Sequence, residues 1–155
     1  MKKLIKQSLV LEDPWTKIEE NHDNNTHYPW FSLVPLETLV LRDQWPLPQA
    51  WIGAWFESNV NPDLFSKNIL DLPVLSIEVA DYQDGRCFSL AKILKTKLNF
   101  QGDLRISGNF LLDQIAMLKA CGVDSFLLPD GSDHEHALFI LKNSPCSLFR
   151  DDALL

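Results

Sequence analysis

Two arginines are the side chains of this sequence best suited to holding a ligand. Arg86 directly precedes a segment with helical periodicity, and Arg105 lies in a short apolar run. Two guanidinium groups near the free N–H groups of a helix N-terminus suit a small oxyanion such as sulfite, sulfate or phosphate. The alternative is structural. In that case Asp84 and Arg86 form a turn, and Arg105 pairs with Asp113 or Asp103.

Other chemically capable residues have a simpler interpretation. Asp113 and Gln114 fall in the first turn of a predicted helix, where they could bind a ligand, although the helix dipole favours a carboxylate there in any case. Cys87 precedes a helix, which can lower the pKa of a thiol, but no second cysteine is spaced for redox exchange. His134 and His136 are two residues apart and so face different sides of a helix. We therefore predict a packing cysteine, solvated histidines and no metal site.

Several classes of site have no support in the sequence. No Gly-x-Gly-x-x-Gly follows a predicted strand, and there is no P-loop, so we expect no nucleotide cofactor. No four-cysteine spacing is present that could hold an iron–sulfur cluster or sirohaem. The three cysteines, Cys87, Cys121 and Cys146, are odd in number and widely spaced, which fits a reducing compartment. We expect no cofactor.

The composition indicates one globular domain in the cytoplasm. The chain has 155 residues, of which 46% are hydrophobic and 23% charged, so it can bury a core. Its formal charge of −7 argues against nucleic-acid binding, because phosphates require a basic face. We find no pattern typical of a signal peptide and no apolar stretch of the roughly 20 residues that a membrane span needs.

The elements that must position these residues alternate along the chain. Apolar runs typical of buried strands occupy residues 50–56, 74–79, 104–106 and 125–128, and helical patterns follow at 61–70, 88–98, 110–121 and 132–141. This predicts an α/β fold of four successive β-α units with a mainly parallel, half-barrel-like sheet. Residues 1–47 form an N-terminal arm with short strands and a short helix starting near Val34, residues 48–143 the repeat domain, and residues 144–155 a tail.

A half barrel leaves strand edges that must be covered. We expect the apolar strand 50–56 to be covered by the N-terminal arm, with a second subunit, and thus a homodimer, as the alternative. Ligands of parallel sheets bind beyond the carboxyl ends of the strands. The segments that follow the predicted strands are 57–59, 81–86, 107–109 and 129–131.

Several motifs in order resemble one bacterial family. They are Asp84-Gly85-Arg86, Phe88-Ser89-Leu90-Ala91, Gly102-Asp103-Leu104-Arg105, Gly108, Asp113-Gln114 and Gly122-Val123-Asp124-Ser125-Phe126. Over roughly residues 48–141 the chain resembles the uncharacterised family called domain of unknown function 934. Its members are often named a probable oxidoreductase of sulfite reduction and are usually encoded beside the assimilatory sulfite reductase haemoprotein.

The resemblance implies an accessory protein of assimilatory sulfate or sulfite reduction that binds a small oxyanion or a partner. That partner would be the sulfite reductase haemoprotein or another enzyme of sulfur assimilation. An oxidoreductase with a rim site at Asp84, Arg86 and Arg105 is one alternative, and a structural stabiliser of the complex is another. Together the rim positions and family motifs give these candidate ligand-binding residues: Asp84, Gly85, Arg86, Ser89, Arg105, Gly108, Asp113 and Gln114.

Overall fold

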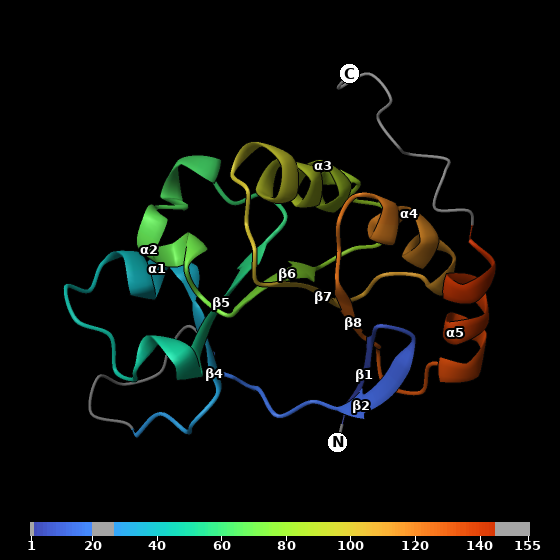
Figure 1. Ribbon diagram of the computed structural model, residues 1–155, viewed down its shortest axis with the longest axis horizontal. Helices are drawn as coiled ribbons and strands as arrows, with labels where there is room; N and C mark the ends of the chain where they lie inside the picture. Colours follow the sequence, from blue (N-terminus) through green and yellow to red (C-terminus); the bar gives the residue numbers. More distant parts are fainter. Residues whose placement is uncertain (1, 20–26, 145–155) are drawn as a thin grey trace.

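The computed structural model describes residues 2–19 and 27–144, which fold around one curled sheet (Figure 1). Its eight strands lie in the order β2-β1-β8-β7-β6-β5-β4-β3. Neighbours from β3 to β8 run parallel, whereas β1 is antiparallel to both β8 and β2. The strands are β1 Lys3–Lys6, β2 Leu9–Glu12, β3 Thr16–Lys17, β4 Ser32–Pro35, β5 Ile52–Glu57, β6 Val74–Val79, β7 Asp103–Gly108 and β8 Ser125–Leu127.

Helices follow each parallel strand from β4 onward. They are α1 Leu36–Val40, α2 Lys67–Leu70, α3 Arg86–Lys92, α4 Ile115–Ala120 and α5 His134–Asn143, with short turns η1 Gln49–Trp51, η2 Pro62–Leu64, the π-helical η3 Ile93–Lys97 and η4 Leu112–Gln114. The predicted α/β fold of successive β-α units in a mainly parallel, half-barrel-like sheet is confirmed. Gly122 follows α4 with φ +107°, the left-handed conformation in which many helices end and which favours glycine.

One element was predicted wrongly. We expected a helix to begin near Val34, but residues 32–35 form strand β4, and the helix starts only at Leu36. Val34 pairs with Ala54 of β5, and its side chain is fully buried. A further unit, β4–α1, therefore precedes the four predicted ones. Since β4 covers the edge of β5, the arm does hide that apolar strand, as we had expected.

The main core lies between the helices and the outer face of the sheet. Successive residues of a strand point to opposite faces, so every second residue of β6 and β7 enters this core. Leu75, Ile77, Leu104 and Ile106 are fully buried in one cluster with residues from the helices. The opposite, concave face carries the other set of side chains, and several of these are polar or charged, among them Ser76, Arg105 and Ser125.

The N-terminal arm reaches both edges of the sheet. The β1–β2 hairpin pairs with β8, with Leu4 opposite Leu127, and β3 extends the far edge beside β4. The chain between the hairpin and β3 crosses the open side of the half barrel (Figure 1). We call this crossing segment, residues 13–15, the strap.

Candidate functional site

Polar side chains form two rows across the concave face. Strand pairing places Ser76, Arg105 and Ser125 side by side on β6, β7 and β8, with Lys6 of β1 next to Ser125. One step further along the strands, Glu78 lies beside Ser107. These positions alternate with the core-facing residues, so they point away from the helices. A row of polar groups on strands buried on both sides indicates a site rather than a core.

Arg105 is the most deeply buried charge of this face, with its side chain 1% exposed. Its Nη1 donates to Asp13 Oδ1 of the strap at 2.8 Å, and its Nη2 lies 3.7 Å from Asp103 Oδ2. Asp103 Oδ2 also accepts from Ser125 Oγ at 3.0 Å and lies 3.7 Å from Lys6 Nζ. Two carboxylates thus balance two cations, and we call these four residues, with Ser125, the Arg105 cluster.

A cavity of about 860 Å³ opens beside this cluster, at the carboxyl ends of the strands. The Lys17 ammonium forms an ion pair with Glu78 and lies 4.0 Å from the centre of the Trp55 ring. Trp55 is fixed in turn, because its Nε1 donates to the Ile18 carbonyl at 2.8 Å. We call this cavity the strand-end pocket; its lining also includes Asp13, Trp15, Leu33, Ser76, Ser107, Gly108 and Asn109.

The strand-end pocket can make both polar and stacking contacts. Ser76 Oγ and Ser107 Oγ are 3.4 Å apart and can each donate or accept. Lys17 adds a cation, Glu78 an anion, and the two tryptophans adjoining the pocket present aromatic surface. The arrangement suits a small polar ligand, as expected for a pocket with a few convergent polar groups. The Lys17–Glu78 pair also places an ammonium and a carboxylate together in the pocket.

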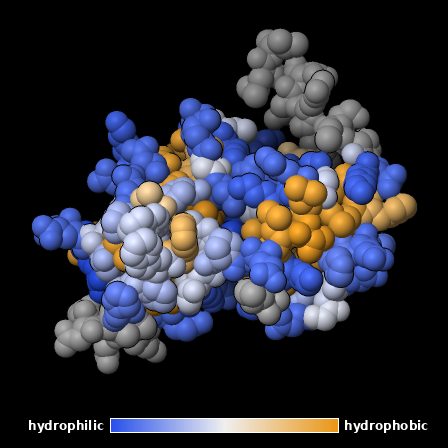
Figure 2. Space-filling model, turned by 60° about the horizontal axis from the view of Figure 1, so that its bottom comes forward, coloured by the Kyte–Doolittle hydropathy of each residue, from blue (hydrophilic) through white to orange (hydrophobic). Residues whose placement is uncertain are grey.

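The surface around the concave side is divided by polarity. With the bottom of Figure 1 turned forward, hydrophilic residues separate a pale region from an apolar patch (Figure 2). Leu9 and Leu11 of β2 are 60% and 42% exposed and lie on the same face of the hairpin as Leu4. The polar site is therefore bordered by apolar surface on the hairpin side.

Arg86, predicted beside Arg105 at the site, instead pairs locally. Its Nε and Nη2 donate to both carboxylate oxygens of Asp84 at 2.8–3.1 Å, and both residues are solvent-accessible. The hydrogen bonds from Arg86 lower the pKa of Asp84, and those same bonds raise the pKa of Arg86. Gly85 precedes α3 as its N-cap, and Ser89 is exposed on that helix. This is the structural turn that we gave as the alternative.

Gln114 and Asn109 join two loops at the rim. Gln114 Nε2 donates to the Tyr82 carbonyl at 2.9 Å, while its Oε1 accepts from Leu111 N at 3.0 Å. Asn109 Nδ2 donates to the Ala80 carbonyl at 3.0 Å. Asp113 is exposed in η4. Together these bonds fix the loop after β6 to the loop after β7.

Among the predicted residues, Gly108 is the one whose backbone conformation and close neighbours require glycine. Its φ is +91°, and a Cβ placed there would lie 2.3 Å from the Val79 carbonyl oxygen. Only glycine fits so close to a neighbouring strand. Of the predicted residues, Arg105 and Gly108 thus belong to the concave site, whereas Asp84, Gly85, Arg86, Ser89, Asp113 and Gln114 lie on the outer rim and its helices.

The sequence analysis missed Asp13, Lys17 and Glu78. Asp13 is 92 residues from Arg105 along the chain, so no local pattern joins them. Glu78 did leave a signal, because it alternates with apolar residues in a strand that is otherwise buried. Polar residues at every second position of β6 and β7 would have indicated the concave face.

Cys87 is buried, and burial raises the pKa of its thiol. This is the opposite of activation by the following helix and fits the predicted packing role. Within residues 2–19 and 27–144, no group of three or more His, Cys, Asp or Glu is placed to hold a metal ion. Cys146 and the tail 145–155 lie outside the described residues.

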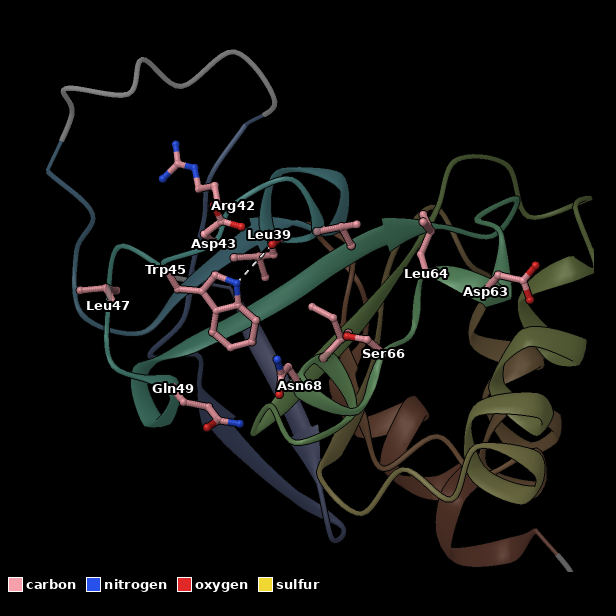
Figure 3. A pocket seen from close by; sticks show the side chains of 12 residues that line it. Leu39, Arg42, Asp43, Trp45, Leu47, Gln49, Asp63, Leu64, Ser66 and Asn68 are labelled. Atoms are coloured by element: carbon pink, nitrogen blue, oxygen red, sulfur yellow. Dashed lines mark hydrogen bonds between the residues drawn. The ribbon is translucent and has the colours of Figure 1, made fainter.

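A second groove, of about 570 Å³, lies between the loop after α1 and the η2–α2 segment (Figure 3). The Trp45 indole points into it and is held by a hydrogen bond from Nε1 to the Leu39 carbonyl at 3.2 Å.

Buried polar atoms without a hydrogen bond gather on the concave face instead. Among the described residues there are four such side-chain atoms, and three lie on that face: Glu78 Oε2, Asp103 Oδ1 and Arg105 Nε. Of these, Glu78 Oε2 has the Lys17 ion pair. Because the buried polar atoms without a hydrogen bond are concentrated on the concave face, we place the site there.

The comparisons with known proteins give a match to one family model. Residues 53–146 match the family described as "Bacterial protein of unknown function (DUF934)". No curated protein and no solved structure matches the chain. The match includes Ser76, Glu78, Arg105 and Ser107 but not the strap or Lys17. In the described part of the chain, no helix is long and apolar enough to cross a membrane.

Proposed function

This chain belongs to the DUF934 family of bacterial proteins of unknown function, and we propose that it is an accessory protein of assimilatory sulfate or sulfite reduction. In this proposal it binds a small oxyanion of that pathway in the strand-end pocket and delivers or senses it beside a partner enzyme. The link to sulfite reduction rests on the sequence resemblance described above. The observation that supports binding is the position of the strand-end pocket.

That position is where parallel sheets bind their ligands. The pocket lies at the carboxyl ends of β6 and β7, where loops can contact a ligand while the sheet stays rigid. Lys17 Nζ, Ser76 Oγ, Ser107 Oγ and Asn109 Nδ2 are donors suited to an oxyanion. Glu78 neutralises Lys17, so an anion must exchange with the Glu78 carboxylate or bind beside it.

A thermal-shift titration tests ligand binding. A ligand that binds the native state raises its melting temperature, so sulfite and sulfate are titrated against chloride at equal ionic strength. Ser107→Leu fills the pocket and should remove the rise, whereas Asn68→Ala in the groove of Figure 3 should keep it. Quenching of Trp15 and Trp55, which line the pocket, gives an independent signal. An equal response to chloride and to sulfite would exclude this ligand class.

Partner binding is tested separately. Tagged protein is recovered from cells grown on sulfate as the sole sulfur source, and bound proteins are identified. Recovery of the sulfite reductase haemoprotein supports the accessory role. Recovery of the haemoprotein together with no oxyanion response in the titration would favour the structural stabiliser instead.

The Lys17–Glu78 pair favours an enzyme as the second candidate. A paired amine and carboxylate beside a ligand pocket can deliver a proton to bound sulfite while the partner haemoprotein supplies the electrons. This site replaces the rim site proposed from the sequence, since Arg86 and Arg105 contact different carboxylates. If the protein contributes to turnover, Lys17→Met should lower the rate of sulfite reduction at saturating sulfite in a mixture of this protein and the sulfite reductase haemoprotein. An unchanged rate would leave only the binding role.

A further inference from the structure

Arg105 has more hydrogen-bonding capacity than the described residues use. A guanidinium carries five N–H donors, yet its one hydrogen bond among residues 2–19 and 27–144 is from Nη1 to Asp13 Oδ1. Asp103 is a longer contact at 3.7 Å, and Arg105 Nε has no hydrogen-bond partner among those residues. Buried donors without acceptors are uncommon and call for an explanation.

The partner of Arg105 is a carboxylate from outside the sheet. Asp13 belongs to the strap, and the same Oδ1 atom also accepts from the Trp15 backbone N–H at 3.1 Å. The strap lines the strand-end pocket through Asp13, Pro14 and Trp15. A change at Asp13 can therefore move the strap without breaking any pairing between strands.

The charges of the Arg105 cluster leave room for one exchangeable anion. With Asp13 removed, the buried Arg105 guanidinium keeps only its 3.7 Å contact with Asp103, which Lys6 shares, so a buried positive charge is left without a close partner. Such a charge is strongly unfavourable. A small anion with two or three oxygens could take the place of Asp13 at Nη1 and accept from Nη2 as well.

We infer that the Arg105 cluster is an oxyanion-binding subsite, that Asp13 is its internal occupant, and that a small carboxylate or sulfite binds by replacing Asp13 and releasing the strap. The inference rests on the proposed function and adds an anion-binding group beside the strand-end pocket, which shares Asp13 with the Arg105 cluster. The anion and Asp13 compete for one guanidinium. Wild-type affinity is consequently weaker than that of a chain lacking the Asp13 carboxylate.

Chemical rescue of Asp13→Ala is the first test. Formate, acetate or sulfite at tens of millimolar should raise the melting temperature of this variant by several degrees above that in chloride at equal ionic strength. The rise should be smaller in wild type and absent in Asp13→Ala/Arg105→Ala. Asp84→Ala is the matched control, because it frees the exposed Arg86 guanidinium and should show no rescue. Equal responses of Asp13→Ala and Asp84→Ala would overturn the inference.

A second measurement does not depend on the variant folding. Anion binding to wild type removes the acceptor of the Trp15 N–H, so exchange of that amide with solvent should speed up in formate. The Arg86 N–H is bonded to Asp84 Oδ1 at the same 3.1 Å and should not change. An unchanged Trp15 amide at high formate would contradict displacement of the strap.

The two anions separate this inference from the proposed function. If formate and acetate raise the melting temperature of Asp13→Ala but sulfite does not, the anion subsite is supported and sulfite is excluded as its ligand. A sulfite response in wild type that Asp13→Ala does not strengthen keeps the proposed function and removes the internal competition.

Discussion

The chain contains two arginine–aspartate pairs whose surroundings are opposite. Arg86 and Asp84 are two residues apart, form a bidentate contact and are solvent-accessible. Arg105 and Asp13 are 92 residues apart, share one hydrogen bond of 2.8 Å, and have side chains only 1% and 7% exposed. The geometrically better pair is thus the exposed one, and the less complete pair is buried.

The difference shows that burial, rather than the number of hydrogen bonds, decides what a pair does. An exposed pair adds little to stability because water and salt screen it. A buried pair has lost its hydration, so removing one partner leaves the other with a large penalty. Asp84–Arg86 shapes a turn before α3, whereas Asp13–Arg105 joins the N-terminal arm to the centre of the sheet.

Removal of Arg105 should give the largest effect. In Arg105→Ala, Asp13 and Asp103 lose their buried cation, and we expect the free energy of unfolding to fall by about 3–5 kcal/mol. Urea denaturation followed by circular dichroism measures this change. Arg86→Ala is the matched control, and an equally large loss there would refute the contrast between the two pairs.

Replacing both buried partners should cost much less. In Asp13→Leu/Arg105→Met no charge of the pair remains, and Asp103 keeps Lys6 and Ser125. Apolar replacement of a buried ion pair often leaves stability unchanged. We therefore expect the free energy of unfolding to stay within about 1–2 kcal/mol of the wild-type value. A double-mutant cycle with Asp13→Leu and Arg105→Met measures the coupling. Additive single losses would show that the two side chains act independently.

Loss of the Gln114 bridge should have a moderate effect at the rim, beside the exposed pair. Gln114→Ala removes the hydrogen bond to the Tyr82 carbonyl, which joins the loops after β6 and β7, and a second one from Leu111 N within the loop after β7. We expect a loss of about 0.5–1.5 kcal/mol in the free energy of unfolding. Faster amide exchange in residues 80–85 would accompany it, and unchanged exchange there would argue against the bridge.

The exposed pair should show the smallest effect, with a defined pH dependence. The pKa of Asp84 is lowered from 3.8 by its hydrogen bonds with Arg86, so its stabilisation is present above pH 3.8 and disappears as the pH falls through the lower, folded-state value. Wild type and Asp84→Asn should therefore differ slightly in denaturant midpoint at pH 7. The difference should vanish at strongly acidic pH and in high salt. A difference that grows on acidification would contradict the assignment.

The repeating part of the fold could be predicted because each of its strands carries a local pattern. Residues 74–79 form an apolar run between turn signals, and residues 88–98 show helical spacing. Ser32–Pro35 was missed because its four residues are followed at once by a helix, and Pro35 also fits a helix start. Pairing with β5, which no local pattern reveals, makes this segment a strand.

The candidate site was less predictable for a related reason. Arg105 was identified, with Asp103 as one suggested partner, because a charged residue in an apolar strand is conspicuous. Asp13 was not, because it lies in a polar segment that reads as a loop. Arg86 attracted attention through its turn and helix, yet that local pattern fixes only a local pair. The buried partner depends on the three-dimensional path of the strap.

The pairing of β1 with β8 determines when the sheet can be completed during translation. Leu4 leaves the ribosome early, but its partner Leu127 emerges only after the other strands of the sheet. Bringing such distant segments together is entropically costly and slows folding. Central strands β5 to β7 can pair first, since each meets a neighbour made shortly before it. We expect the hairpin to dock last, so the nascent chain acquires its strand-end pocket only when synthesis of β8 is finished.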